Sequence, residues 1–156
     1  MKKKTLRLLA GLLAAVTLTA CGTDPEITQF KKKVDTFCIS VAELNKSINE
    51  IDAQADDASE LALAYLDQLD KQFQDFAELD FPEEYDYLES LADEAGNYMK
   101  EAVNSYHEAY EGETYDENTA AYARENSARA LKRVQIILSI LRGEDPSESQ
   151  SSSGAE

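Results

Sequence analysis

The sequence is poor in the residues that interrupt or cross-link a chain. Its 156 residues include 6 Gly, 3 Pro, 2 Cys and no Trp. Few helix breakers, together with many Ala, Leu, Glu, Asp and Lys, favour helices over sheet. The chain has a single histidine, His107, and the residue three before it is Asn104. It therefore lacks the two Glu-x-x-His motifs of a di-iron bundle.

Positive charge is also scarce. The chain carries 15 Lys and Arg against 31 Asp and Glu, which gives a formal net charge of −16. Nucleic-acid binding needs a basic stripe that neutralises phosphates, so we expect no nucleic-acid partner. Adjacent acids such as Asp56–Asp57 and Glu83–Glu84 carry no pattern that separates a general acid–base pair from solvated carboxylates.

Motifs of the common enzyme and cofactor sites are missing as well. The sequence has no G-x-S-x-G, no G-x-x-x-x-G-K-[ST], no G-x-G-x-x-G and no D-x-D-x-D-G calcium loop. We therefore predict no catalytic residue and no cofactor. Three hypotheses on function are an interaction module, a ligand-binding protein and an enzyme, and the enzyme is the least supported of them.

Basic and apolar residues are instead concentrated at the start of the chain. Lys2, Lys3, Lys4 and Arg7 precede an apolar run over residues 8–20. The run is shorter than the about 20 residues of a membrane-spanning helix, and it has the length of the central region of a secretory signal peptide. Residues 1–20 are therefore predicted to be a signal peptide.

The end of this segment, Leu18-Thr19-Ala20-Cys21, resembles the lipobox of bacterial lipoprotein precursors. The resemblance implies cleavage before Cys21 and attachment of two acyl chains, such as palmitate, to that residue. Two chains give a stable anchor at the extracytoplasmic face of the cell membrane. The rest of the chain resembles uncharacterised helical lipoproteins of Gram-positive bacteria. Residues 21–24 would be the lipidated cysteine and a short spacer.

Apolar residues recur at helical spacing from residue 25 to residue 142. In the first segment they alternate steps of three and four, as in a helix packed in a bundle, at Ile27, Phe30, Val34, Phe37, Val41, Leu44, Ile48 and Ile51. Asp24 and Pro25 predict the start of this helix, which should end near Ala55. Asp57 with Glu60 resembles a capping box at the start of a second helix.

Two further helices complete the pattern. Phe81-Pro82 stops the second helix, and Pro82 suits the first turn of a third, which Gly112 ends. A fourth runs from about Glu117 to Arg142. The sequence predicts an all-α antiparallel up-down-up-down four-helix bundle over 25–142, with three long helices as the alternative. Residues 143–156, rich in Ser and acids, are predicted to be a disordered tail.

Two groups of basic residues are candidate contact surfaces. Lys31, Lys32 and Lys33 follow the spacer closely, so they would contact either anionic lipid headgroups or the acids of a solvated face. On the fourth helix, one face carries basic and apolar residues opposite the core stripe. It consists of Arg129, Lys132, Arg133, Ile136 and Ile140. This face would contact lipid, a partner helix or a second copy, or it would pack internally with its basic residues paired to acids of the third helix.

Three other features leave alternatives open. After loss of the leader, Cys38 is either a small buried hydrophobe or the site of an intermolecular disulfide. His107 and Glu111 lie one turn apart and are weak candidates for metal ligands, although a solvated pair is the simpler interpretation. Seven of the eight tyrosines fall in the second half of the chain, where they form either the rim of the core or a ligand-binding cluster.

These features favour a membrane-anchored, non-enzymatic protein-interaction or scaffold module, with an envelope protein or a second copy as partner. The alternative is a lipoprotein that binds a cation or small molecule between its helices. An apolar core without polar groups favours the first hypothesis. A pocket with converging tyrosines, His107 and carboxylates favours the second.

Overall fold

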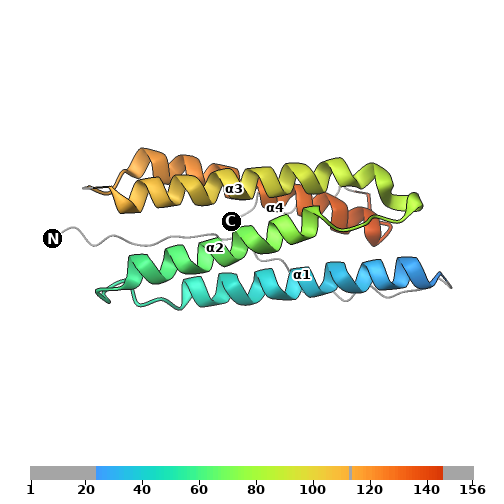
Figure 1. Ribbon diagram of the computed structural model, residues 1–156, viewed down its shortest axis with the longest axis horizontal. Helices are drawn as coiled ribbons and strands as arrows, with labels where there is room; N and C mark the ends of the chain where they lie inside the picture. Colours follow the sequence, from blue (N-terminus) through green and yellow to red (C-terminus); the bar gives the residue numbers. More distant parts are fainter. Residues whose placement is uncertain (1–23, 113, 146–156) are drawn as a thin grey trace.

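The structure is a computed structural model that describes residues 24–112 and 114–145. This part of the chain forms the helices α1 (Pro25–Asn49), α2 (Ala58–Ala77), α3 (Glu89–Glu111) and α4 (Glu117–Leu141), with a 3₁₀ helix, η1 (Glu83–Leu88), before α3 (Figure 1). The all-α prediction is confirmed. The predicted signal peptide, Cys21 and residues 146–156 of the predicted tail lie outside the described residues.

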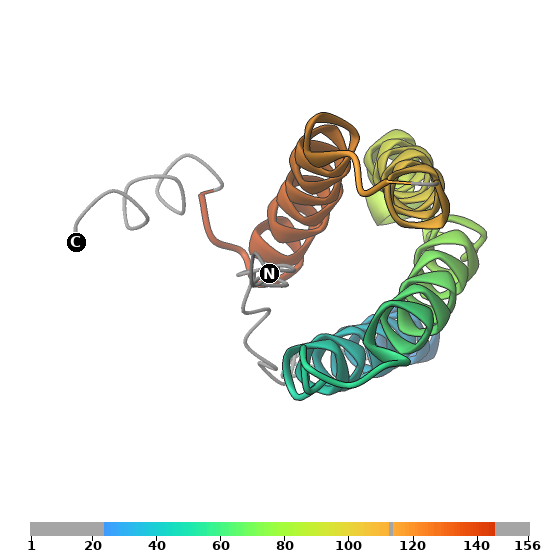
Figure 2. The ribbon, with the colours of Figure 1, turned by 90° about the vertical axis from the view of Figure 1, so that its left-hand side faces the viewer.

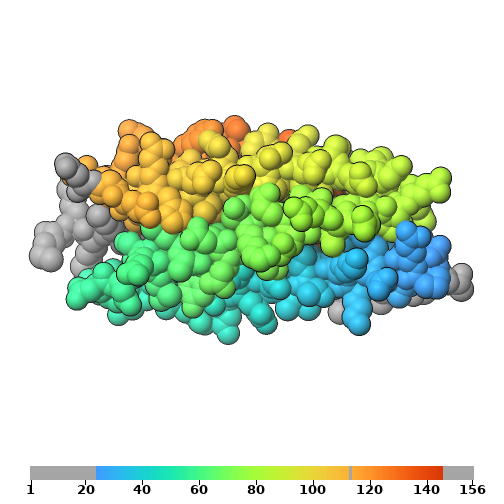
Figure 3. All heavy atoms as spheres, viewed as in Figure 1, coloured from blue at the N-terminus to red at the C-terminus, as the bar shows by residue number. Residues whose placement is uncertain are grey.

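The helices follow one another around an arc, so that each packs against the next in the sequence (Figure 2). Consecutive helices run in opposite directions, and α2 lies between α1 and α3 on one face of the molecule (Figures 1 and 3). The start of α1 and the end of α4 therefore lie at the same end of the bundle. The four-helix prediction is confirmed, and the alternative of three long helices is wrong because residues 50–57 interrupt the chain.

The start of α1 agrees with the prediction from the sequence, whereas its end does not. The Asp24 carboxylate accepts a hydrogen bond from the Glu26 amide at 2.8 Å, and Pro25 occupies the first helical position. The helix ends at Asn49 and not near Ala55. In the following turn the Asp52 carboxylate accepts the Gln54 amide at 2.9 Å, which offers the backbone an alternative to continuing the helix.

The start of α2 lacks the predicted capping box. Asp57 occupies the N-cap position, but its side chain makes no capping hydrogen bond, because its backbone (φ −97°, ψ 7°) is not extended. Asp116 before α4 is extended (φ −98°, ψ 104°), and its carboxylate accepts the amides of Asn118 and Thr119. The two aspartates therefore differ in capping because their backbone conformations differ, and the sequence did not reveal this difference.

The third helix also begins later than predicted. The chain after Pro82 first makes the 3₁₀ helix η1, and α3 starts only at Glu89. Phe81, two residues before η1, and Leu88, the last residue of η1, are both buried in the core. The tighter 3₁₀ turn lets the short connection bring both side chains inward.

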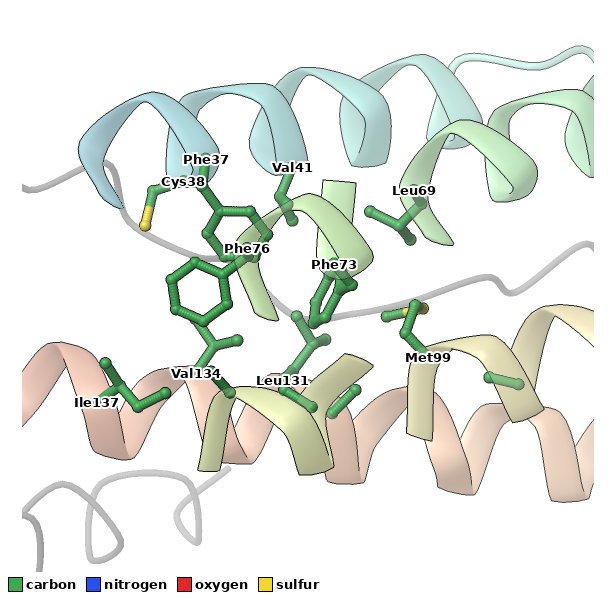
Figure 4. Close-up of a cluster of buried hydrophobic side chains, with 14 of the residues drawn as sticks. Phe37, Cys38, Val41, Leu69, Phe73, Phe76, Met99, Leu131, Val134 and Ile137 are labelled. Atoms are coloured by element: carbon green, nitrogen blue, oxygen red, sulfur yellow. The ribbon is translucent and has the colours of Figure 1, made fainter. Parts of the chain in front are cut away.

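The core has an aromatic half and a half rich in small and polar residues. All five phenylalanines of the chain lie in the first half of α1, the last turns of α2 and the segment just after it. The Phe37 ring stacks on Phe76 at 4.3 Å between centroids and meets Phe73 edge-on at 5.2 Å. Phe76 lies between Phe37 and Val134 of α4 (Figure 4). These contacts join three helices.

Close approach between helices depends on small residues elsewhere. Gly96 of α3 faces α2, where an added Cβ would meet the Ala77 Cβ at 3.3 Å. The Gln74 side-chain amide donates to the Gly96 carbonyl at 2.9 Å across this contact. Buried alanines line both α3 and α4. None of the described helices is both long and apolar enough to cross a membrane.

Phe76→Ala should lower the free energy of unfolding by about 3–5 kcal/mol, because it removes a buried ring that contacts three helices. Urea denaturation followed by circular dichroism would measure the loss. The matched control is Tyr87→Ala, since the Tyr87 side chain is 60% exposed. A loss below about 1 kcal/mol for Phe76→Ala would show that the ring cluster does not stabilise the bundle.

Candidate functional site

The lysines predicted to face lipid lie near the start of α1. Lys32 and Lys33 are exposed, and Lys31 is half-buried with its ammonium 5.9 Å from the centre of the Tyr85 ring. Tyr85 belongs to η1, which also carries Glu83, Glu84 and Asp86. The fold therefore brings the aromatic ring of an acidic segment beside Lys31.

The basic residues of α4 pack against α3. The Arg133 guanidinium pairs with the Glu94 carboxylate and lies 5.6 Å from the centre of the Tyr98 ring. Arg129 pairs with Glu125 of its own helix and lies 5.7 Å from the same ring. Tyr98 thus sits beside two cations, an arrangement that contributes cation–π attraction. Lys132 is exposed.

The two isoleucines of this face differ in surroundings. Both Ile136 and Ile140 are half-buried, and Ile140 packs against the hydrophobic core. The basic–apolar face is therefore partly an internal contact, at Arg133 and Ile140. The exposed part that remains for another molecule centres on Lys132, Arg129 and Ile136.

His107 bridges two helices through carboxylates on both sides of its ring. Its Nδ1 lies 2.8 Å from Glu111 Oε1, and its Nε2 lies 2.8 Å from Asp67 Oδ1 of α2. Partial burial lowers the pKa of His107, but the hydrogen bonds to Glu111 and Asp67 outweigh this effect and raise the pKa above its ordinary value. Only the imidazolium donates from both nitrogens, so the geometry suits the protonated form.

This cluster has no free ring nitrogen to offer a metal ion. Within residues 24–112 and 114–145, no group of three or more His, Cys, Asp and Glu side chains could hold one. Sequence reasoning missed Asp67, which lies 40 residues before His107 and meets it only through the packing of α2 on α3. The sequence contains no signal that would distinguish Asp67 from neighbouring acids.

The tyrosines divide between exposed and buried positions. Tyr87 and Tyr122 are exposed, whereas Tyr106 is buried and Tyr110 packs against the core. Near the turn between α3 and α4, the rings of Tyr110 and Tyr115 lie 4.9 Å apart. Burial raises the pKa of Tyr106 to about 12, so this phenol stays protonated. The fold therefore gathers Tyr106, Tyr110 and Tyr115 at one end of the bundle.

Cys38 is buried on α1. Burial, followed by the nearby Asp35 charge, raises the pKa of its thiol to about 11. The thiolate is the reactive form, so this cysteine is a poor nucleophile at neutral pH. The structure favours the small buried hydrophobe over an intermolecular disulfide.

A groove of about 460 Å³ runs between α1 and α2 on the outside of the bundle. Its walls include Ser40, Leu44 and Ser47 from α1 and Tyr65, Gln68 and Gln72 from α2, with Glu43 and Lys71 at the edges. The lining has one acid and one base, which makes it close to neutral on a very acidic chain. This composition suits an uncharged polar ligand better than a cation.

His107→Gln should destabilise the protein more at low pH than at high pH. The folded-state pKa of His107 is raised, so its stabilising effect is complete below the unfolded value of about 6.5 and disappears as the pH rises through the folded value. Melting temperatures of both proteins at about pH 5.5 and about pH 8.5 would give the difference at each pH.

The expected result is a melting-temperature difference that shrinks at the higher pH. Lys71→Gln is the matched control, because Lys71 pairs with Asp75 on an exposed surface of α2, the helix that also carries Asp67. A difference between wild type and His107→Gln that grows with pH would contradict the protonated bridge.

Comparison of the chain with models of known protein families, with curated proteins and with solved structures finds no match.

Proposed function

We propose that the chain is a lipid-anchored lipoprotein at the extracytoplasmic face of the cell membrane, whose bundle is a non-enzymatic protein-interaction module. The observation that carries this proposal is the resemblance of Leu18-Thr19-Ala20-Cys21 to a lipobox, together with the start of α1 only four residues after Cys21, at Pro25. So short a spacer would hold the bundle against the membrane, in place to meet other envelope proteins.

The distribution of charge supports an interaction surface more than a catalytic one. Within the described residues no Asp or Glu side chain is buried. General acid–base catalysis relies on carboxyl groups whose pKa values are shifted by burial or by a close like charge. Exposed acids instead give a strongly charged surface, which governs the choice and approach of partners.

The exposed part of the α4 face supplies a patch that differs from the rest of this surface. Arg129, Lys132 and Ile136 place positive charge beside an apolar side chain on an otherwise acidic chain. Interfaces are enriched in arginine and in apolar residues that become buried. We take this patch as the contact surface for an envelope protein or a second copy.

The alternative is a lipoprotein that binds a small molecule between helices. It is supported by the near-neutral α1–α2 groove and by polar side chains inside the bundle, at Asn45, Ser105, Asn126 and Ser127. Such groups are expected less in a bundle whose only task is to present a surface, since each buried polar group needs a partner.

Cys21→Ser should release the protein from membranes into the soluble extracytoplasmic fraction, because the substitution removes the acylated thiol. Fractionation of cells, with metabolic labelling by a palmitate analogue, would measure both effects. Cys38→Ser is the matched control and should leave labelling and membrane attachment unchanged. A Cys21→Ser protein that still carries label and stays in the membrane fraction would contradict lipidation at Cys21.

A photoreactive amino acid at position 132 should capture a specific envelope protein, or a second copy, in intact membranes. The control is the same amino acid at position 59, which is exposed at the start of α2. Crosslinked bands would be separated and identified by mass spectrometry. A protein captured only from position 132 supports the interaction module, whereas lipid adducts alone, or equal capture from both positions, would contradict it.

A further inference from the structure

The groove between α1 and α2 has the size and shape of a ligand site. Its volume of about 460 Å³ falls within the roughly 300–1,000 Å³ of ligand pockets in proteins, so it has room for a small molecule. Its walls run from Ser40 to Ser47 on α1 and from Tyr65 to Gln72 on α2. Each wall is about 10 Å long at 1.5 Å per residue. The groove therefore suits a ligand that lies along the two helices.

The polar residues of the α2 wall lie outside the stripe that builds the core. Tyr65, Gln68 and Gln72 follow one another at steps of three and four residues and therefore share one face of α2. The core contacts of the same stretch come from other residues, including Leu66 and Phe73, which are both 0% exposed. Packing of the core therefore does not account for the two glutamines of this face.

The antiparallel arrangement of α1 and α2 sets which side chains face each other across the groove. The Phe37 ring of α1 contacts the last turns of α2, so residues further along α1 lie opposite residues further back along α2. Ser47 therefore lies at the same end of the groove as Tyr65, and Ser40 lies at the end with Gln72. One end combines a hydroxyl with an aromatic ring, and the other combines a hydroxyl with an amide.

The polar groups of the groove have hydrogen-bonding capacity left for a ligand. Gln68 donates one amide hydrogen to the Ala64 carbonyl of its own helix at 3.2 Å, which leaves its other hydrogen and its oxygen. In the part of the chain that the structure describes, the side chains of Ser40, Ser47 and Gln72 make no hydrogen bond. Serine hydroxyls and carboxamides both donate and accept, so these groups match a ligand that carries hydroxyls.

The charged residues at the edges of the groove favour a neutral ligand. The Lys71 ammonium is already paired with the Asp75 carboxylate of its own helix at 2.7 Å. The Glu43 carboxylate on the α1 side would repel an anion, and a single carboxylate is too few for a cation that takes several oxygen ligands. A carboxylate has two oxygens, so it accepts hydrogen bonds from two neighbouring hydroxyls of one ligand.

Tyr65 supplies the aromatic surface of the groove. It is half-buried and packs against the hydrophobic core, which limits the motion of its ring. The C–H face of a sugar ring packs on such an apolar surface, while the hydroxyls at its rim reach polar groups. Among the described residues that line the groove, Leu44 is the one aliphatic side chain, whereas a bound peptide needs pockets for its side chains. A saccharide therefore matches this lining better than a peptide.

We propose that the groove between α1 and α2 binds a neutral saccharide, in which Tyr65 packs on a sugar ring while the Gln72 amide and the Glu43 carboxylate bind its hydroxyls. This inference deepens the ligand-binding alternative, because it names the ligand class of the same groove. It depends neither on the lipid anchor nor on the α4 patch. Its failure would leave the expected results at Cys21 and at position 132 unchanged, so the proposals fail separately.

Titration with neutral trisaccharides tests the site. The intact protein, isolated from membranes in a detergent without a sugar headgroup, would be titrated with maltotriose, cellotriose and triacetylchitotriose. NMR would follow the ring signals of Tyr65 and the side-chain amide signals of Gln68 and Gln72. We expect at least one sugar to shift these signals with millimolar or tighter affinity. The absence of a shift with every sugar at millimolar concentration would overturn the proposal.

Tyr65→Leu and Gln72→Ala should each weaken sugar binding by roughly tenfold, because they remove the stacking surface and a hydrogen-bonding group. Leu keeps an apolar side chain against the core at position 65, and Gln72 lies outside the core, so both variants should fold. Melting curves would check this. Tyr122→Leu is the matched control and should leave the affinity unchanged, because Tyr122 is 48% exposed on α4. Unchanged affinity in both groove variants would overturn the proposal.

Tri-alanine in the same titration separates a peptide site from a saccharide site. A shift with tri-alanine and with none of the sugars would assign the groove to peptides and overturn the proposal. A shift with a sugar that both groove variants weaken, and that tri-alanine does not reproduce, supports it.

Discussion

The contact of Phe37 with Phe73 and Phe76 is the interaction on which the rest of the structure depends. It fixes the register of α1 against α2, because the stacked and edge-on rings leave little freedom to slide. Phe76 reaches the α4 side of the core at Val134 (Figure 4). The height of Asn45 on α1 relative to Asp67 on α2 therefore follows from this one cluster and the constant rise of a helix.

The two halves of the core differ in the kinds of side chain that they bury. The aromatic half buries large rings, each of which removes a large apolar area from water. The other half holds four of the five buried polar side chains found among the described residues: Asn45, Ser105, Asn126 and Ser127. Each of these needs a hydrogen-bond partner to avoid a cost, and Ser105 finds one in the Glu101 carbonyl of its own helix.

The periodic part of the sequence predicted the fold well. It left open whether basic residues of α4 pair with acids of α3, as Arg133 does with Glu94, and it missed the contact of Asp67 with His107. The three–four spacing of Phe30, Val34 and Phe37 specifies an inward stripe, and these residues are buried as expected. The pairing of Asp67 with His107, and of Glu94 with Arg133, depends on which faces meet after packing. A pattern confined to one helix carries no information on that choice. The prediction of helix starts failed for a local reason. Asp57 and Asp116 both occupy N-cap positions, but they differ in backbone conformation.

The number of helices determines where the two candidate sites lie relative to a lipid anchor. With four antiparallel helices, α4 ends beside the start of α1, so Ile136 and Ile140 lie toward the end of the bundle that an acylated Cys21 would hold (Figure 1). Asn45 follows Pro25 by 20 residues, about 30 Å along α1. The α1–α2 groove, whose walls include the neighbouring Leu44, would thus be held away from the bilayer. Because the groove opens between α1 and α2 whereas the patch lies on α4, a partner at the patch does not exclude a ligand in the groove.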